Sequence, residues 1–334
     1  MNTQAKIKSI NLQALTIGSK VLKIVERSEN SLTVQGVFDH AIYLRGSNDE
    51  LIKVIRNKDF LSPSSIRVEG AEEVRFRAAE IKEGANIIFE RDALTAQDLA
   101  LTINLENASI FKPTGIPDSA CLLSIEEINL NLRILKDIIY TAPSREGLVH
   151  LLENVEKHGP LEVFVKEQKP TMSERARPYI DQLMWGIFGG DTHAIIKSVG
   201  EILGLGPGLT PSCDDFLAGL LMSINTAGAS IFRSEPQTVR FFNKISSDIS
   251  ALAKEKTTIY SQSLLNEAAV GEGPENALDL ILSIVTMSPE QVAGLSKRLT
   301  SVGATSGADI SIGVYYGIRF LTSRIEMREI NEFE

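Results

Sequence analysis

The chain has 334 residues, of which 43% are hydrophobic and 23% charged, and this composition suits a globular protein large enough for two domains. Its net charge of −9 argues against a nucleic-acid partner, because phosphate backbones attract basic surfaces. No apolar run could span a membrane or serve as a signal peptide, and two distant cysteines give no disulfide framework, so we expect a cytoplasmic protein without membrane contact.

The first third of the chain predicts β-structure. Short apolar runs at residues 21–25, 32–38, 42–44, 66–68 and 87–89 are separated by polar turns, and residues 34–37 and 74–77 alternate as half-buried strands do. Several short strands at close spacing favour a small sheet or barrel.

Helical signals dominate from Ser124 onward. Ser124 and Glu127 are spaced as a capping box, and Ser288 begins a further helix. Another helix is expected from Ser144 to Gly159, followed by a strand-like run at 161–165. We therefore predict an α+β protein with a β-rich domain at 1–120 and a mainly helical domain at 121–334.

Residues 170–190 offer two minor candidates. Arg175 and Arg177 could hold a carboxylate with two hydrogen bonds, although surface positions are the simpler interpretation. Trp185 lies in an apolar run and is expected to pack in the core. The histidines are too widely spaced for a zinc site.

A glycine-rich loop at residues 204–215 is the most informative feature of the sequence. Asp191 can cap the helix before it, and Gly204 suits the left-handed residue that ends such a helix. The next helix begins either with Thr210 as its cap or with Ser212 and Asp215 as a capping box.

The charge of this loop leaves its ligand open. Backbone N–H groups at a helix start attract anions, whereas Asp214 and Asp215 in the same turn repel them. The acids could complement the helix dipole, hold a divalent cation such as Mg²⁺, or bind a substrate amide. No lysine follows the glycines and no strand precedes them, so neither a Walker loop nor a dinucleotide fingerprint is indicated.

A second segment repeats the pattern Gly-x-Thr-x-x-x-Asp of Gly208, Thr210 and Asp214. It comprises residues 303–309, with Ser306 and Asp309 spaced as a capping box at the start of an apolar helix. Gly313 and Gly317 in that helix would let another helix approach closely. The repeat suggests that two hydroxyl-rich helix starts converge on one site.

Residues 257–261 offer two further hydroxyl groups. Thr258 and Ser261 would lie on one helical face and could reach a site. Ordinary capping of the helix by Thr257 is the alternative.

The loop sequence GLGPGLTPSCDDFLAG, together with the late GATSGAD, resembles the AllH-like family, the H-type subunit of oxamate carbamoyltransferase. The resemblance is strongest over residues 180–320, and residues 37–44 and 62–66 resemble the family's weaker N-terminal signature. Cys213 stands where the family pattern leads us to expect glycine, so its thiol is not expected to be a required nucleophile.

The resemblance implies a reaction in bacterial allantoin breakdown. Oxamate and carbamoyl phosphate would be interconverted with oxalurate and phosphate, with FdrA-type and G-type companion subunits. Such a transfer needs donors for the phosphate and carbonyl oxygens and a group that holds the oxamate. The residues of suitable type are, for catalysis, Thr210, Ser212, Asp214 and Asp309, and, for the anionic substrates, Gly206, Gly208, Thr305, Ser306 and Gly307.

Two alternatives remain open at this point. The chain could be a non-catalytic partner subunit whose loop docks a companion. It could also be a Mg²⁺-dependent phosphotransferase that uses Asp214 and Asp215 as metal ligands.

Overall fold

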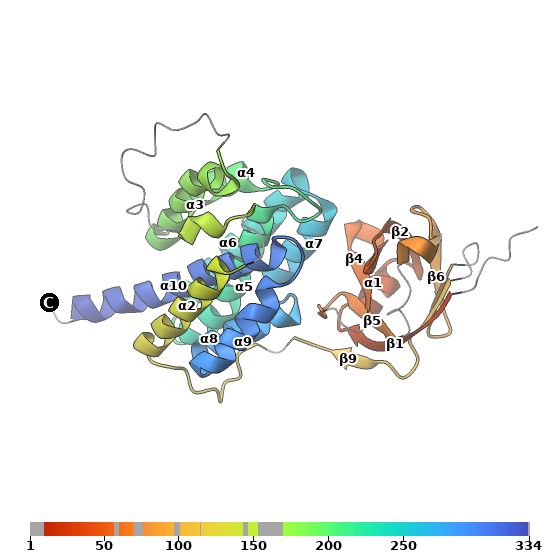
Figure 1. The fold of residues 1–334 in the computed structure, drawn as a ribbon, viewed down its shortest axis with the longest axis horizontal. Coiled ribbons are helices and arrows are strands. Elements are labelled where there is room, and N and C mark those ends of the chain that lie inside the picture. Colours follow the sequence, from red (N-terminus) through yellow and green to blue (C-terminus); the bar gives the residue numbers. More distant parts are fainter. Residues whose placement is uncertain are drawn as a thin grey trace, which may run out of the picture. The chain divides into compact units, whose positions relative to one another are not determined.

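A computed structural model describes residues 10–56, 60–69, 76–79, 81–96, 101–113, 115–142, 146–152 and 170–332. The chain divides into two compact units, residues 1–113 and 114–334. The described strands and α1 belong to the first unit and helices α2 to α10 to the second, as Figure 1 shows. The α+β layout expected from the sequence is therefore confirmed.

The described part of the first unit forms a nine-stranded sheet that closes on itself. Its strands are β1 (Ile10–Gly18), β2 (Ser31–Val37), β3 (Ala41–Arg45), β4 (Leu51–Arg56), β5 (Ser65–Glu69), β6 (Asn86–Glu90), β7 (Ala93–Ala96), β8 (Leu101–Asn104) and β9 (Ser109–Phe111). Their order is β5-β4-β3-β2-β6-β7-β8-β1-β9, and β1 also pairs with β5. This last pairing removes the free edges of those two strands and makes the sheet a barrel.

Two parts of this unit depart from the predicted strands. The apolar run at 21–25 lies in a short helix, α1 (Val21–Arg27), which buries Val21, Ile24 and Val25. Phe76 and Arg77 belong to a 3-10 helix, Phe76–Ala79, while residues 70–75 lie outside the described part. Runs this short do not distinguish a strand from a buried helical turn.

The second unit is built of helices. They are α2 (Ile125–Tyr140), α3 (Met172–Gly189), α4 (Thr192–Ile202), α5 (Ser212–Ile231), α6 (Pro236–Lys256), α7 (Ile259–Ala268), α8 (Glu275–Thr286), α9 (Pro289–Thr300) and α10 (Ser306–Glu332). The capping boxes of Ser124 with Glu127 and of Ser288 with Gln291 are both formed. Asp191 caps α4 through the N–H groups of His193 and Ala194. These helix starts were predicted correctly because a cap is a local interaction within four residues.

Helix α5 forms the centre of the helical unit. Its residues from Ser212 to Ile224 are all buried, including polar ones, and the first part of α10, residues 307–314, is buried in the same way. A helix that is apolar on every side must be surrounded, and α6, α7, α8 and α10 pack around it. Figure 1 shows α5 within this group of helices.

Helices α5 and α10 pack together at backbone distance. A Cβ atom at Gly313 would lie 2.0 Å from the Phe216 carbonyl oxygen, and one at Gly219 would lie 2.1 Å from that of Ile310. Only glycine permits this approach. The expected close approach at Gly313 and Gly317 is thus confirmed.

The pairing also gives the relative direction of the two helices. Positions further along α5 meet positions further along α10, in the order Phe216 with Gly313 and then Ser223 with Gly317. The helices therefore run parallel, and their N-terminal ends lie side by side. This arrangement brings the two loops that precede them together.

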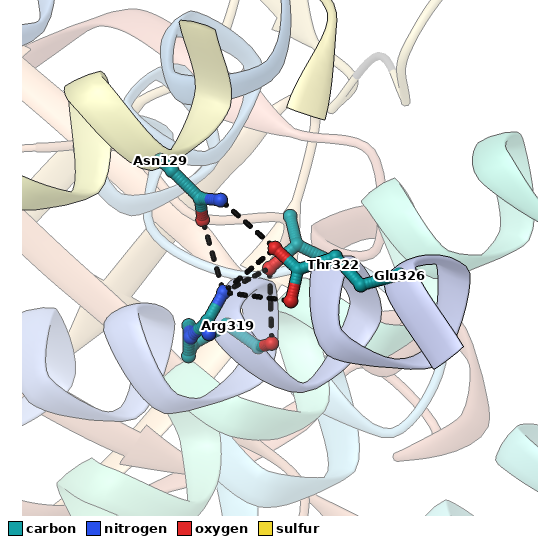
Figure 2. A network of polar contacts seen from close by, with 4 residues as sticks. All are labelled: Asn129, Arg319, Thr322 and Glu326. Carbon is teal, nitrogen blue, oxygen red and sulfur yellow. Dashed lines mark hydrogen bonds and ion pairs between the residues drawn. The ribbon is translucent and has the colours of Figure 1, made fainter. Parts of the chain in front are cut away.

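A polar network fastens the later part of α10 to α2 (Figure 2). The Asn129 side chain donates to Glu326 (3.0 Å) and accepts from Arg319 (3.1 Å). Arg319 also donates to Thr322 (3.3 Å) and forms an ion pair with Glu326 (3.2 Å). Because these groups are partly exposed, we assign them a role in orientation more than in stability.

Two expectations for residues 144–190 are revised. The helix expected from Ser144 to Gly159 is, where described, a 3-10 helix at Val149–Leu152, and the strand-like run at 161–165 lies outside the described residues. Trp185 was expected in the core but is 75% exposed, on the outer side of α3 beside Phe188. Within the described residues, no helix has the length and apolar character to cross a membrane.

Candidate functional site

The glycine-rich loop and the turn before α10 meet through two hydroxyl groups. Thr210 Oγ1 lies 3.3 Å from Ser306 Oγ, although the residues are 96 positions apart in the chain. Both side chains are half-buried. The convergence suggested by the repeated motif is therefore present in the structure.

Glycines give the loop its shape. Gly204 (φ 76°), Gly206 (φ 138°) and Gly208 (φ 94°) adopt the left-handed region, which other residues rarely tolerate. A Cβ atom at Gly206 would lie 2.4 Å from the Ser212 nitrogen, so the loop folds closely over the start of α5. Among the described residues, nothing lies within 4 Å of a Cβ at Gly208, where the loop faces open space.

The start of α5 differs from both predicted caps. Pro211 is the residue before the helix, and no side chain caps it. Thr210 and Asp215 instead bond to each other, with the Thr210 hydroxyl donating to Asp215 Oδ2 (3.1 Å). The side chains of Thr210 and Asp215, which were expected to cap α5, therefore form a contact between the loop and the first turn of the helix.

Asp214 fastens the loop to the segment between α6 and α7. Its Oδ1 accepts the Gly204 N–H (2.8 Å), and its Oδ2 accepts the Thr257 hydroxyl. The side chain is fully buried. Burial raises the pKa of Asp214, while Thr257, Gly204 and Ser261 act in the opposite direction by stabilising the carboxylate.

The carboxyl group of Asp215 lies next to the hydroxyls of Thr210 and Ser306. It is 1% exposed, and burial raises its pKa well above the ordinary value. Ser306 and Thr210 lower the pKa, and the charges of Asp309 and Asp214 raise it further. A carboxyl group in this setting holds its proton more strongly than an exposed one.

Asp309 joins the start of α10 to the 3-10 helix at 149–152. Its Oδ1 accepts the Leu148 N–H (2.7 Å), and this contact replaces the capping box expected with Ser306. Burial raises the pKa of Asp309 to about 6, against the lowering effects of Leu148, Ser212 and Thr305.

Ser212 faces Asp309 between the two helix starts. It is 1% exposed and close enough to lower the pKa of Asp309. Within the described residues, neither Ser212 Oγ nor Asp309 Oδ2 makes a hydrogen bond of good geometry. Buried polar atoms without well-formed partners are uncommon, and here the Ser212 hydroxyl and the Asp309 carboxyl face each other between the helix starts.

Cys213 does not have the properties of a nucleophile. Its side chain is fully buried. Burial, followed by the charges of Asp214 and Asp309, raises the pKa of the thiol far above its ordinary value. The reactive thiolate is therefore suppressed, as expected where the family pattern has no thiol.

The two remaining site candidates from the second motif, Thr305 and Gly307, differ in their surroundings. Thr305 is half-buried and lies near Asp309, whose pKa it lowers. Gly307 is buried, and a Cβ there would lie 1.9 Å from the Leu299 carbonyl oxygen. Gly307 therefore permits the packing of α10 on α9.

The two acids proposed as Mg²⁺ ligands are oriented toward hydrogen-bond donors. Both oxygens of Asp214 accept hydrogen bonds, and Asp215 accepts one from Thr210. In the part of the chain that the structure describes, no group of three or more His, Cys, Asp or Glu side chains could hold a metal ion. The arrangement suits the positioning of hydroxyls and loop backbone better than the coordination of a cation.

Some contacts of the site were not predicted from the sequence, and the roles expected for Thr257 and Thr258 are exchanged in the structure. Thr258, not Thr257, caps α7 by accepting the Ser261 N–H, and Thr257 is free to bond Asp214. The Leu148 N–H has no sequence signal at all, since any residue carries one. Arg177 donates to the His150 carbonyl oxygen (2.7 Å), and Arg175 is exposed.

Comparisons with protein families cover most of the chain. Residues 202–318 match the family model described as oxamate carbamoyltransferase subunit AllH. Residues 13–110 match the model of the AllH family N-terminal domain. No solved structure matches the chain. The first match contains the starts of both α5 and α10, and the second contains the described barrel strands almost entirely.

Proposed function

Because the chain belongs to the AllH family, we propose that it is a subunit of a carbamoyltransferase complex and that the paired starts of α5 and α10 hold its anionic substrates. The observation that carries the proposal is the contact between Thr210 and Ser306 above the buried Asp215. It places two hydroxyls, two helix N-termini and an open glycine turn at one position, which is a suitable environment for phosphate or carboxylate.

The proposed reaction transfers a carbamoyl group from carbamoyl phosphate to the amide nitrogen of oxamate. A bond forms between that nitrogen and the carbamoyl carbon, and the bond from this carbon to the phosphate oxygen breaks. Phosphate leaves with the electron pair, the amide nitrogen loses a proton, and oxalurate is the product. No covalent intermediate on the protein is required, so positioning and electrostatic stabilisation supply the rate enhancement.

The structure suggests how the named residues divide this work. Thr210 and Ser306 are half-buried and can contact an anion directly, together with the loop at Gly206 and Gly208. Asp214 and Asp309 are fully buried, so we assign them an orienting role through the segments that they fasten. Ser212 adds a further hydroxyl group between the starts of α5 and α10.

Asp215 is proposed as the group that directs the Thr210 hydroxyl. When it is ionised, its raised pKa also makes it a stronger base than an exposed carboxylate, and it accepts a hydrogen bond from the Thr210 hydroxyl. The amide proton could therefore leave through that hydroxyl without direct contact between Asp215 and the substrate.

Reconstitution with FdrA-type and G-type companion subunits tests this proposal. Oxalurate formation should require this chain and should fall at least about a hundredfold when Thr210 is replaced by Val, which keeps the shape but removes the hydroxyl. Thr286→Val is a matched control, because Thr286 Oγ1 donates to the Leu282 carbonyl oxygen within α8 and has no other hydrogen bond among the described residues.

Three other outcomes would contradict the proposal. Full activity of the Thr210→Val complex would remove the assigned site. Activity of the companions without this chain would favour the non-catalytic partner. Strict Mg²⁺ dependence with nucleotide turnover would favour the phosphotransferase.

A further inference from the structure

The hydroxyl of Thr258 makes two hydrogen bonds within the protein. It donates to the Leu209 carbonyl oxygen (2.5 Å) and accepts the Ser261 N–H (3.1 Å). The N–H of Ser261 can only donate, so the single hydroxyl proton of Thr258 must point to Leu209. Thr258 thus fixes the direction of one peptide group in the glycine-rich loop.

The direction of the Leu209 carbonyl determines the direction of the next N–H. The described chain contains no cis peptide bonds, so the Leu209 C=O and the Thr210 N–H point to opposite sides of the same planar unit. The carbonyl points to Thr258, and the N–H therefore points away from it. Among the described residues, no hydrogen-bond acceptor takes the Thr210 N–H.

A second observation at the same place indicates a ligand. Ser212, 1% exposed, lies on the first turn of α5 facing Asp309 of α10, and its Oγ makes no hydrogen bond of good geometry within the described residues. A buried polar atom and an oriented backbone donor at the same paired helix starts suit a small anionic group.

We propose that Thr258 is a positioning residue that holds the Leu209–Thr210 peptide so that the Thr210 N–H donates to the anionic substrate. This inference rests on the proposed function in taking the paired helix starts as the anion site. The hydrogen bond from Thr258 to the carbonyl also polarises the peptide group and makes the N–H a better donor. Thr258 itself does not touch the substrate.

The test compares Thr258→Val with Thr258→Ser in the full chain. Inorganic phosphate and carbamoyl phosphate are titrated into each protein by calorimetry, and the Thr210 amide is followed by NMR after selective labelling of threonine with ¹⁵N. We expect phosphate to shift the Thr210 amide signal in the wild type and in Thr258→Ser. We expect Thr258→Val to bind carbamoyl phosphate about tenfold more weakly or worse, because one hydrogen bond to a charged group is misdirected.

Thr258→Val also removes the cap of α7, and the effect of this loss on stability must be separated from the effect on anion binding. Ser124→Ala removes a comparable cap, at the start of α2, and lowers the stability of the helical unit. It should lower stability as Thr258→Val does and leave phosphate binding unchanged. In the assembled complex, Thr258→Val should raise KM for carbamoyl phosphate, and Thr258→Ser should restore it.

The outcomes distinguish this inference from the proposed function. If the wild type binds carbamoyl phosphate and Thr258→Val binds it equally well, the role of Thr258 is overturned while the site stands. A Thr210 amide signal that does not move when phosphate binds would also overturn the role of Thr258 while the site stands. If the wild type binds neither anion, both proposals fail.

Discussion

Replacing Asp309 by Asn should make the protein relatively more stable as the pH rises. The side chain is fully buried, and its Oδ1 accepts the Leu148 N–H. Asn keeps an oxygen for this bond, and its amide nitrogen can donate to Ser212 Oγ, which faces it and makes no hydrogen bond of good geometry within the described residues. The substitution therefore removes the charge and retains the contacts.

The size of the effect follows from the pKa of Asp309, which is raised from 3.8 to about 6. Because the folded state holds the proton more strongly, stability is lost as the pH rises from about 4 to 6. The full cost above pH 6 is about 3 kcal/mol, at 1.36 kcal/mol for each pH unit. Between pH 4.5 and 7.5 the ionisation of Asp309 lowers the free energy of unfolding of the wild type by about 2 kcal/mol. Asp309→Asn does not show this loss, because its side chain does not ionise.

Urea denaturation of both proteins at several pH values measures this difference. Ellipticity at 222 nm reports the helical unit, which contains Asp309 and helices α2 to α10. Asp118→Asn is a matched control, because the Asp118 side chain is 91% exposed. A stability difference between Asp309→Asn and wild type that stays constant from pH 4.5 to 7.5 would show that the pKa of Asp309 is not raised in the folded protein.

Two further predictions concern packing and reactivity. Gly313→Ala should destabilise the helical unit by at least ~2 kcal/mol, because the new Cβ would lie 2.0 Å from a carbonyl oxygen of α5. Gly294→Ala, with nothing within 4 Å, should instead stabilise it by about 0.5–1 kcal/mol; equal denaturation midpoints for the two variants would contradict the close helix packing. A thiol reagent should label only Cys121 in the native protein and both cysteines in urea, since Cys213 is buried with a raised pKa. Rapid native labelling of Cys213 would show that the start of α5 opens.

Local patterns allowed much of this structure to be predicted from sequence. The caps at Ser124, Asp191 and Ser288 depend on residues within one turn, and Gly204 adopts the left-handed conformation that its place after a helix requires. The convergence of Thr210 and Ser306 could be predicted because the motif occurs twice.

Contacts between distant segments could not be predicted in the same way. The partners of Asp214 and Asp309 come from Thr257 and from the Leu148 backbone, 43 and 161 positions away. Asp309 was expected in a capping box with Ser306, and Thr257 was the alternative cap of the following helix, but both residues take part in these long-range contacts instead. Trp185 shows the same limit, since an apolar run identifies helix α3 but does not determine which residues face outward.

Calorimetric titration of carbamoyl phosphate into the isolated chain, with and without Mg²⁺, measures whether the paired helix starts bind the anion. We expect micromolar binding that does not need Mg²⁺ and that is lost in Thr210→Val, because the hydroxyl at the paired helix starts contacts the anion. Binding that is unaffected by this substitution, or no heat in either buffer, would contradict the assignment of the anion site to this subunit's helix starts.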